Sequence, residues 1–451
     1  MATTTLADAK AASLKAKLAA ENRKVAERYP VEPGRRQPVH TVYGGAHLFS
    51  AELPAKLGKV ALAALEAYGG DARSFARSAG FTDSPELAEV IHGRVLQKLQ
   101  SEPVEDFRID FEDGYGNRPD AEEDATALAA AGEVARAMEA GTIPPFVGIR
   151  IKPLSDELAA RSLRTLDLFV STLVRKTSGR LPDHFVITLP KITTPTHVEV
   201  LADALDALEH GLGLFRGAIA IELMIEVTQS IIGPDGSVAL AGLLDAARGR
   251  CVAAHFGTYD YTASCQITAA HQHMTHPACD FARQMMQVAY AGRGIWLSDG
   301  ATNIMPVPPH RAAAGGPPLT DAQLAENRQT VHAAWKLHVE HIHHSLVHGY
   351  YQGWDLHPAQ LPTRYAAVYA FFLEGLEPAS IRLKNFVEQA AQATLVGDVF
   401  DDAATGQGLL NFFLRGVSCG AITEEEALAT GLTLAELRGR SFVKVLENRR
   451  A

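Results

Sequence analysis

Cysteine is scarce in this sequence: only 4 of its 451 residues are cysteines, and no two of them form a CxxC pair. Disulfide-stabilised secreted domains carry a dense set of cysteines, and many zinc-binding modules carry closely spaced pairs. The sequence therefore excludes both classes of protein. We expect structural thiols in a reducing cytoplasm, at Cys251, Cys265, Cys279 and Cys419.

Long hydrophobic runs are also absent, and none approaches the ~18 apolar residues that a membrane-spanning helix requires. Residues 1–30 lack the apolar core of a secretion signal and carry charges throughout, so we expect an exposed helix there. The alanines, threonines and lysines of this segment would also suit a transit peptide, but Asp8 and Glu21 argue against one. The sequence thus predicts a cytoplasmic protein without a membrane partner.

An excess of basic residues is the third missing feature. The chain has 42 Lys and Arg residues against 52 Asp and Glu residues, which gives a net charge of −10. Nucleic-acid-binding domains and proteins that bind anionic membranes usually carry a positive surface. We therefore expect neither nucleic acid nor a lipid surface as a partner.

Short apolar runs of strand length are present, and they alternate with amphipathic helical patterns. Such alternation indicates βα units around a parallel sheet, and eight units predict an α/β fold of the (β/α)₈ TIM barrel type. The candidate strands are Val39–Tyr43, Phe107–Phe111, Val147–Ile151, Phe185–Leu189, Ile219–Ile225, Ala253–Gly257, Ile295–Ser298 and Gly353–Leu356.

After Ala359 the pattern is helical to the end of the chain. We therefore expect three parts: an N-terminal helical extension (1–36), a catalytic TIM barrel (37–362) and a helical C-terminal domain (363–451).

Ionisable residues follow the predicted strands, where the active site of a barrel lies. The stretch RIDFEDGYGN ends its strand with Asp110, Glu112 and Asp113, and burying such carboxylates together is unfavourable unless a cation or a proton offsets the charge. One such residue alone would be an ordinary surface charge, but the joint pattern predicts an active site. The other strand-end residues are Arg150, Lys152, Lys191, Glu222, Glu226, Asp260, Asp299, Asp355 and His357.

Two of these acids, Glu226 and Asp260, follow neighbouring predicted strands and are expected to converge on one hard cation. Two carboxylates, completed by water and substrate oxygens, suit Mg²⁺ better than Zn²⁺. The acidic turn at 110–113 would then supply outer or water-mediated contacts.

Five motifs, in this order, resemble those of the citrate lyase β-subunit / malate synthase superfamily, which includes the HpcH/HpaI-type aldolases. The likeness runs from about residue 39 to residue 362. The resemblance implies that Glu226 and Asp260 bind Mg²⁺, with Mn²⁺ as an alternative, and that Arg150 stabilises an enolate oxygen. The motifs are DFEDGYGNRP, LPKI, MIEVTQS, FGTYDYTAS and GWDLHPAQL.

The segment beginning VFDDAAT resembles the C-terminal region of malate synthases. That resemblance implies that Asp402 is the general base. The plain alternative is that the acidic pair caps a helix N-terminus, and both roles are compatible.

The resemblance implies carbon–carbon bond formation or cleavage through an enolate, by a lyase, an aldolase or a malate-synthase-like acyltransferase. The substrate would be a small 2-oxo acid such as glyoxylate or pyruvate. An acyl-CoA is a candidate second substrate, although no motif identifies a coenzyme A pocket, and Thr258 with Tyr259 replaces the Arg-Trp usual in malate synthases.

The remaining site assignments concern proton transfer and substrate binding. Asp110 and Asp113 join Arg150 as expected catalytic residues. Backbone N–H groups around Gly257 and Thr258 would bind the substrate carboxylate, because glycine permits close approach. Lys191 is expected to add a cation for the substrate.

Histidine clusters raise the alternative of a zinc or iron site. Their spacing matches no familiar signature and they lie away from the predicted strand ends, so we expect solvated or helix-capping histidines. The clusters are His271, His273 and His276, and His341, His344 and His348.

Two other functions stay open. One is a different enzyme on the same barrel, directed at phosphoenolpyruvate or a thioester. The other is a barrel without catalysis that serves as a regulatory binding subunit. Members of the superfamily occur as monomers, trimers and hexamers, so a homo-oligomer is also open.

Overall fold

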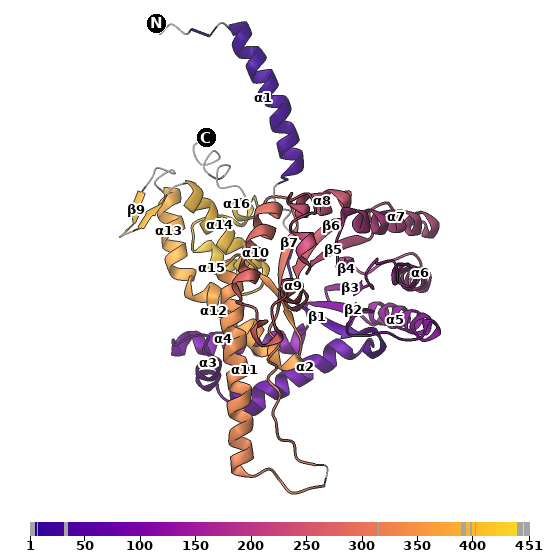
Figure 1. Ribbon diagram of the computed structural model, residues 1–451. Coiled ribbons are helices and arrows are strands. Elements are labelled where there is room, and N and C mark those ends of the chain that lie inside the picture. Colours follow the sequence, from indigo (N-terminus) through magenta and orange to yellow (C-terminus); the bar gives the residue numbers. More distant parts are fainter. Residues whose placement is uncertain are drawn as a thin grey trace.

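Eight parallel strands close into a barrel in the computed structural model, in the order β1 to β8 with β8 paired to β1 (Figure 1). The predicted TIM barrel is therefore confirmed, and every predicted strand overlaps an observed one. The strands are β1 (His40–Gly45), β2 (Asp106–Asp110), β3 (Phe146–Arg150), β4 (Phe185–Leu189), β5 (Ala220–Ile225), β6 (Cys251–Phe256), β7 (Trp296–Ala301) and β8 (Gln352–Asp355). The structure describes residues 5–6, 8–30, 35–313, 315–388, 394–396, 399–401, 403–439 and 445.

Helices surround the barrel and cover its strands. A helix such as α6 buries Leu166, Phe169, Val170 and Leu173, the spacing of one helical face. Because helices cover the outside and side chains fill the inside, the strands are largely buried on both faces, and several of them, such as β4, are mainly apolar. The helices of this layer are α2 (Leu53–Ala64), α3 (Ala72–Ala79), α4 (Pro85–Ser101), α5 (Asp120–Ala140), α6 (Ala159–Lys176), α7 (Pro195–Leu212), α8 (Ala239–Ala246), α9 (Thr258–Ser264), α10 (Pro277–Tyr290) and α11 (Asp321–Val347).

Helix α1 (Asp8–Arg28) extends away from the barrel, and none of its residues is buried (Figure 1). An exposed, charged helix was the expectation for this segment. At its C-terminal end Arg28 lies 2.9 Å from the carboxylate of Asp245, which tethers the helix to the end of α8.

The chain after the barrel is mainly helical, and α12 packs against α4 and α11. The prediction of helix to the end of the chain is wrong at one place, where two short antiparallel strands pair. Asp402, the predicted base, lies outside the described residues. The elements are α12 (Leu361–Glu374), α13 (Leu376–Glu388), β9 (Thr394–Val396), β10 (Val399–Asp401), α14 (Ala403–Ser418), α15 (Glu424–Leu428) and α16 (Leu434–Arg438).

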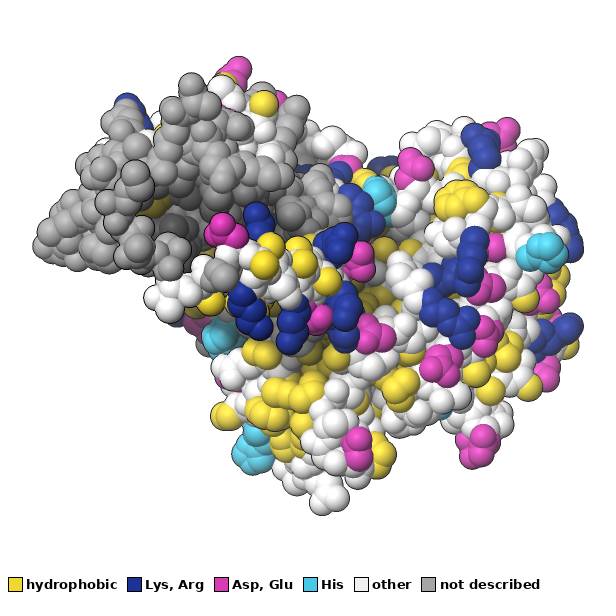
Figure 2. Space-filling view, turned by 90° about the horizontal axis from the view of Figure 1, so that it is seen from above, with side chains coloured by type: hydrophobic (Ala, Val, Ile, Leu, Met, Phe, Trp, Pro, Cys, Tyr) yellow, Lys and Arg dark blue, Asp and Glu magenta, His cyan; other side chains and the backbone are white. Residues whose placement is uncertain are grey.

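No helix in the described part of the chain is long and apolar enough to cross a bilayer. On the face shown in Figure 2, Lys and Arg side chains are interspersed with acidic and hydrophobic ones.

A charged network fills part of the barrel interior. Arg108 on β2 donates to Glu222 on β5, with Nη2 3.1 Å from Oε2, and to Thr188 at 3.0 Å. It also pairs with Asp106, and all three charged side chains are buried. Glu222 was predicted at a strand end; that placement is wrong, because β5 continues to Ile225 and leaves Glu222 inside the barrel.

Asp299 and Asp355 were also predicted at the barrel opening, and this too is wrong. Asp299 lies within β7 and pairs with Arg283 of α10 at 3.1 Å. Asp355 ends β8 and pairs with Arg364 of α12 at 2.8 Å. Since alternate residues of a strand point to opposite faces, these two side chains face the helices rather than the interior.

A candidate active site at the carboxyl ends of the strands

Asp110, at the end of β2, is held by four hydrogen bonds. Its Oδ1 accepts from the Glu112 N–H at 3.0 Å and from Arg150 Nε at 2.7 Å. Its Oδ2 accepts from the Gly114 N–H at 2.8 Å and from Arg150 Nη2 at 2.5 Å. A carboxylate offers about four acceptor positions, and all are used here. Asp110 therefore shapes the acidic turn and orients Arg150, and a catalytic role for it stays a prediction.

Arg150 ends β3 and directs its remaining guanidinium edge toward the acidic turn. Its Nη1 lies 2.9 Å from Glu112 Oε2 and 3.9 Å from Asp113 Oδ2. The guanidinium also lies over the ring of Tyr43, 4.9 Å from its centroid. Burial alone would lower the pKa of Arg150, but the bonded carboxylate of Asp110 raises it well above the ordinary value. Arg150 is thus a fixed, permanent cation.

Lys191, just after β4, places its ammonium group among the acids. The Nζ atom contacts Glu112, and it lies 3.3 Å from Asp113 Oδ2 and 3.4 Å from Asp260 Oδ2. Its backbone has φ 48°, a left-handed conformation that is unfavourable for a side chain with a Cβ. In this conformation the Lys191 N–H donates to Glu226 Oε1 at 2.8 Å. One residue therefore binds four acids.

Both predicted metal ligands contact this lysine, Glu226 through its backbone N–H and Asp260 through its ammonium group. Glu226 follows β5 and is buried, whereas Asp260 lies in the first turn of α9 with its side chain 40% exposed. Burial raises the pKa of Glu226 to about 8; the Lys191 ammonium opposes this shift, and the carboxylates of Asp260 and Glu112 add to it. The site therefore holds more acidic groups than its own cations neutralise.

Gly257 and Thr258 do not form the predicted substrate cradle in full. The Gly257 N–H donates to the Ile225 carbonyl at 3.0 Å as part of the sheet, so this amide is not available to a substrate carboxylate. The Thr258 hydroxyl contacts Met274 Sδ at 3.1 Å. A role for the Thr258 N–H stays a prediction. The expectation for the Gly257 amide is wrong.

Gly257 has a different role, because it makes room for Glu226. A Cβ at this position would lie 2.6 Å from Glu226 Cβ and 2.7 Å from Glu226 Oε2. No side chain fits there unless the Glu226 carboxylate moves.

Gly257→Ala is therefore expected to weaken divalent-cation binding by at least roughly tenfold, within the 10–100-fold loss seen when a residue that orients a metal ligand is changed. The fold should be retained, since its φ of −102° is open to alanine. Titration calorimetry with Mg²⁺ measures the effect. Gly211→Ala is the matched control, because nothing lies within 4 Å of a Cβ there. Equal Mg²⁺ affinity in the two variants would contradict the role assigned to Gly257.

The donor chemistry of the cluster fits a hard divalent cation. No three of its acids bring donor atoms within 4.8 Å of one another in the described part of the chain, so the acids do not form a complete cage. Mg²⁺ is usually held in this way, by one or two carboxylates with other positions open to water and substrate. Five carboxylates face two cations: Asp110, Glu112, Asp113, Glu226 and Asp260 surround Arg150 and Lys191.

Glu112, which the sequence placed in the acidic turn but not among the catalytic residues, is a central member of the cluster. Its carboxylate contacts both Arg150 and Lys191, while burial raises its pKa and those two cations oppose the shift. Lys152, in contrast, was grouped with the strand-end residues but binds Glu123 of α5 at 2.9 Å. The sequence signal for Glu112 was its position directly after Phe111, a buried apolar residue.

The sequence matches, over residues 18–445, the family described as a domain of unknown function (DUF6986). No curated protein matches it.

Solved structures similar to this one include a citrate lyase from Burkholderia xenovorans LB400, with a TM-score of 0.56 at 17% identity, covering 88% of this chain and 97% of that one. CitE from Mycobacterium tuberculosis, in complex with magnesium, acetoacetate and coenzyme A, gives 0.48 at 15% identity, covering 86% and 99%. A malate synthase from Haloferax volcanii, in a lead(II) complex, gives 0.44 at 13% identity, covering 93% and 99%. The predicted resemblance is confirmed at the level of the fold, which the citrate lyase shares.

Proposed function

Because this chain belongs to the DUF6986 family of unknown function and has the fold of a citrate lyase, we propose a function from its own site. The proposed activity is Mg²⁺-dependent formation or cleavage of a carbon–carbon bond beside the carbonyl of a small 2-oxo acid. One observation supports the proposal: Glu226 and Asp260 both contact Lys191, through its N–H and its ammonium group, in a cluster that also contains the buried cation Arg150.

Enolate chemistry needs cations at the developing oxyanion, a base for the α-proton and a fixed electrophile. A divalent ion bound by Glu226 and Asp260 would supply polarisation of the 2-oxo carbonyl. Arg150, oriented by Asp110, stabilises the negative oxygen that forms. Lys191 binds the substrate carboxylate after Glu226 and Asp260, which contact it in the metal-free protein, have bound the ion.

Proton transfer is assigned to acids at the edge of the site. Asp113 has a side chain 63% exposed and lies 3.3 Å from Lys191 Nζ, so it can exchange protons with solvent. Asp402 remains the proposed general base from the family resemblance and lies outside the described residues. Glyoxylate or pyruvate is the proposed oxo acid, with an acyl-CoA as the proposed second substrate.

The decisive experiment is incubation of the full chain with Mg²⁺ and a panel of 2-oxo acids, with and without acyl-CoA, read by mass spectrometry. A Mg²⁺-dependent product with a new or broken carbon–carbon bond supports the proposal. Hydrolysis of a thioester or turnover of phosphoenolpyruvate alone would favour a different enzyme on this barrel. Failure to bind Mg²⁺ would contradict the catalytic proposal and favour a regulatory barrel.

The raised pKa of Glu226 predicts how Mg²⁺ binding depends on pH. The folded, metal-free protein holds a proton on Glu226 up to about pH 8, whereas the ordinary pKa is 4.5. A carboxylate must lose its proton to bind a metal, so binding should release a proton and affinity should rise from pH 6 to pH 8. Calorimetry in buffers of different ionisation enthalpy measures the released proton.

The raised pKa of Glu226 also determines how the stability of the metal-free protein changes with pH. Between the two pKa values the folded state binds more protons than the unfolded state, so the free energy of unfolding of the metal-free protein falls as pH rises. Glu226→Gln should flatten this fall. A Mg²⁺ affinity that does not change between pH 6 and pH 8 would contradict the assignment of Glu226 as a ligand.

A further inference from the structure

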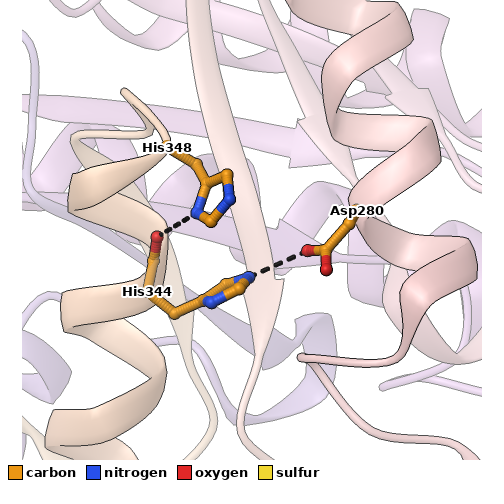
Figure 3. Close-up of side chains that lie close together, drawn as sticks. All are labelled: Asp280, His344 and His348. Carbon is orange, nitrogen blue, oxygen red and sulfur yellow. Dashed lines mark hydrogen bonds and ion pairs between the residues drawn. The ribbon is translucent and has the colours of Figure 1, made fainter.

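A second group of metal-donor side chains lies on the outer surface of the barrel, between α10 and the end of α11 (Figure 3). Asp280 comes from the first turn of α10, His344 from the last turn of α11, and His348 follows that helix directly. One donor atom from each residue lies within 4.8 Å of the others. We propose that Asp280, His344 and His348 bind a divalent transition-metal ion, with Zn²⁺ as the expected occupant, which clamps α10 to α11. This proposal is independent of the reaction proposed above.

The distances require only small side-chain movements. His344 Nε2 lies 2.8 Å from Asp280 Oδ1. Ligand atoms around a tetrahedral zinc ion lie about 3.3–3.5 Å apart, given metal–ligand bonds of about 2.0–2.2 Å. The His344 and His348 rings are 4.3 Å apart between centroids. A modest widening of one pair and closing of the others therefore brings all three donors to zinc-binding geometry.

His348 is already oriented for this role. Its Nδ1 lies 2.8 Å from the His344 carbonyl oxygen, which can only accept a hydrogen bond. Nδ1 therefore carries the proton, and in the neutral ring Nε2 keeps its lone pair. Fixing the tautomer through a backbone carbonyl is the common arrangement for a metal-binding histidine.

His344 Nε2 and Asp280 Oδ1 already face one another. The two atoms lie 2.8 Å apart, so Nε2–H donates to the carboxylate in the metal-free protein. The two N–H groups of Arg283 Nη2 are used by Asp280 and by the Met274 carbonyl, so its 3.2 Å approach to Nε2 needs no lone pair there. Zn²⁺ would displace the Nε2 proton and join the same two atoms.

Arg283 is the cation with which a metal ion would compete for Asp280, and Asp299 offsets part of its charge. Its Nη1 lies 3.1 Å from Asp299 Oδ1, and its Nη2 donates to the Met274 carbonyl at 2.9 Å. Arg283 also pairs with Asp280 and so helps to orient that carboxylate. The donor side chains are 24% exposed for His344 and 30% for Asp280, which admits an ion and leaves room for water as a further ligand.

The mixed set of imidazoles and one carboxylate distinguishes this site from the acidic cluster at the strand ends. Imidazole suits Zn²⁺, Co²⁺ and Ni²⁺, whereas Mg²⁺ prefers oxygen ligands. Saturating Mg²⁺ should therefore occupy the acidic cluster and leave this second site to Zn²⁺.

The test uses the full chain, stripped with a chelator and kept in saturating Mg²⁺. Zn²⁺ is titrated by calorimetry and Co²⁺ by its visible absorption, in the wild type and in His344→Gln, His348→Gln and His343→Gln. His343 is the matched control, because it lies on the same helix and its side chain is exposed. We expect one tight Zn²⁺ per wild-type chain and a melting temperature raised by Zn²⁺.

His344→Gln and His348→Gln should each bind Zn²⁺ more weakly by roughly 10–100-fold or more, because changing a residue that only orients a metal ligand already costs that much affinity. His343→Gln should bind Zn²⁺ as the wild type does. Unchanged affinity in His344→Gln and His348→Gln would overturn the proposal, as would loss of Zn²⁺ binding only in Glu226→Gln. Absence of any Zn²⁺-induced heat or Co²⁺ absorption in the wild type would also overturn it. Circular dichroism monitors folding, and His348→Gln, at a partly exposed position, carries the test if His344→Gln does not fold.

Discussion

Glu226→Gln is expected to lower Mg²⁺-dependent turnover by roughly 10³-fold, the upper end of the loss known for removing one preorganised electrostatic group. The amide keeps the size of the side chain, and its oxygen can still accept the Lys191 N–H that now lies 2.8 Å away. What it loses is the negative charge that a divalent cation requires. Steady-state kinetics over a range of Mg²⁺ concentrations measure the effect.

Glu199→Gln, on the exposed face of α7, is the control for a charge change far from any proposed ligand. It should leave turnover and Mg²⁺ affinity unchanged. Asp260→Asn should behave like Glu226→Gln, because the two acids are proposed to share one ion. Turnover within twofold of wild type in both acid variants would remove the metal from the proposed mechanism.

Arg108→Met should give the largest loss of stability, about 3–5 kcal/mol in the free energy of unfolding, as found when one partner of a buried ion pair is removed. The substitution leaves the Glu222 and Asp106 carboxylates buried in the barrel without their guanidinium partner. Burial already raises the pKa of Asp106 to about 6, although Arg108 opposes the shift. Denaturation by urea, with the midpoint and slope both recorded, measures the loss.

A compensated variant separates charge from packing in this network. Arg108→Met combined with Asp106→Asn and Glu222→Gln removes all three charges, and most of the lost stability should return. A loss below about 1 kcal/mol in the single variant, or no recovery in the combined one, would show that the guanidinium charge is not what stabilises the interior.

The fold was predictable because both faces of each barrel strand are buried. Runs such as Phe185–Leu189 are apolar except for Thr188, and amphipathic helices separate them, so strand number and order could be read directly. Because both faces are buried, the sequence did not show toward which face each polar residue of a strand points. Asp299 and Asp355 sit in or at the end of buried strands, and nothing local distinguishes a carboxylate facing the interior from one facing an arginine on a covering helix.

The residues of the candidate site could be proposed from the sequence, whereas much of its geometry could not. Glu226 and Asp260 follow the parallel neighbouring strands β5 and β6, a relation that strand order alone predicts. The central place of Lys191 depends on a left-handed backbone at a non-glycine residue, for which the sequence carries no signal. The pairing of Asp280 with His344 spans 64 positions and depends on how α10 packs beside α11.

The left-handed turn at Lys191 has a consequence for the proposed magnesium site before an ion enters it. An ammonium group carried by the chain itself already lies among the acids and offsets part of their mutual repulsion. Entry of a divalent ion would then be an exchange, in which the lysine releases its acidic partners and becomes able to bind an incoming anion. Binding of the ion and binding of the substrate should therefore be coupled, so that each raises the affinity for the other.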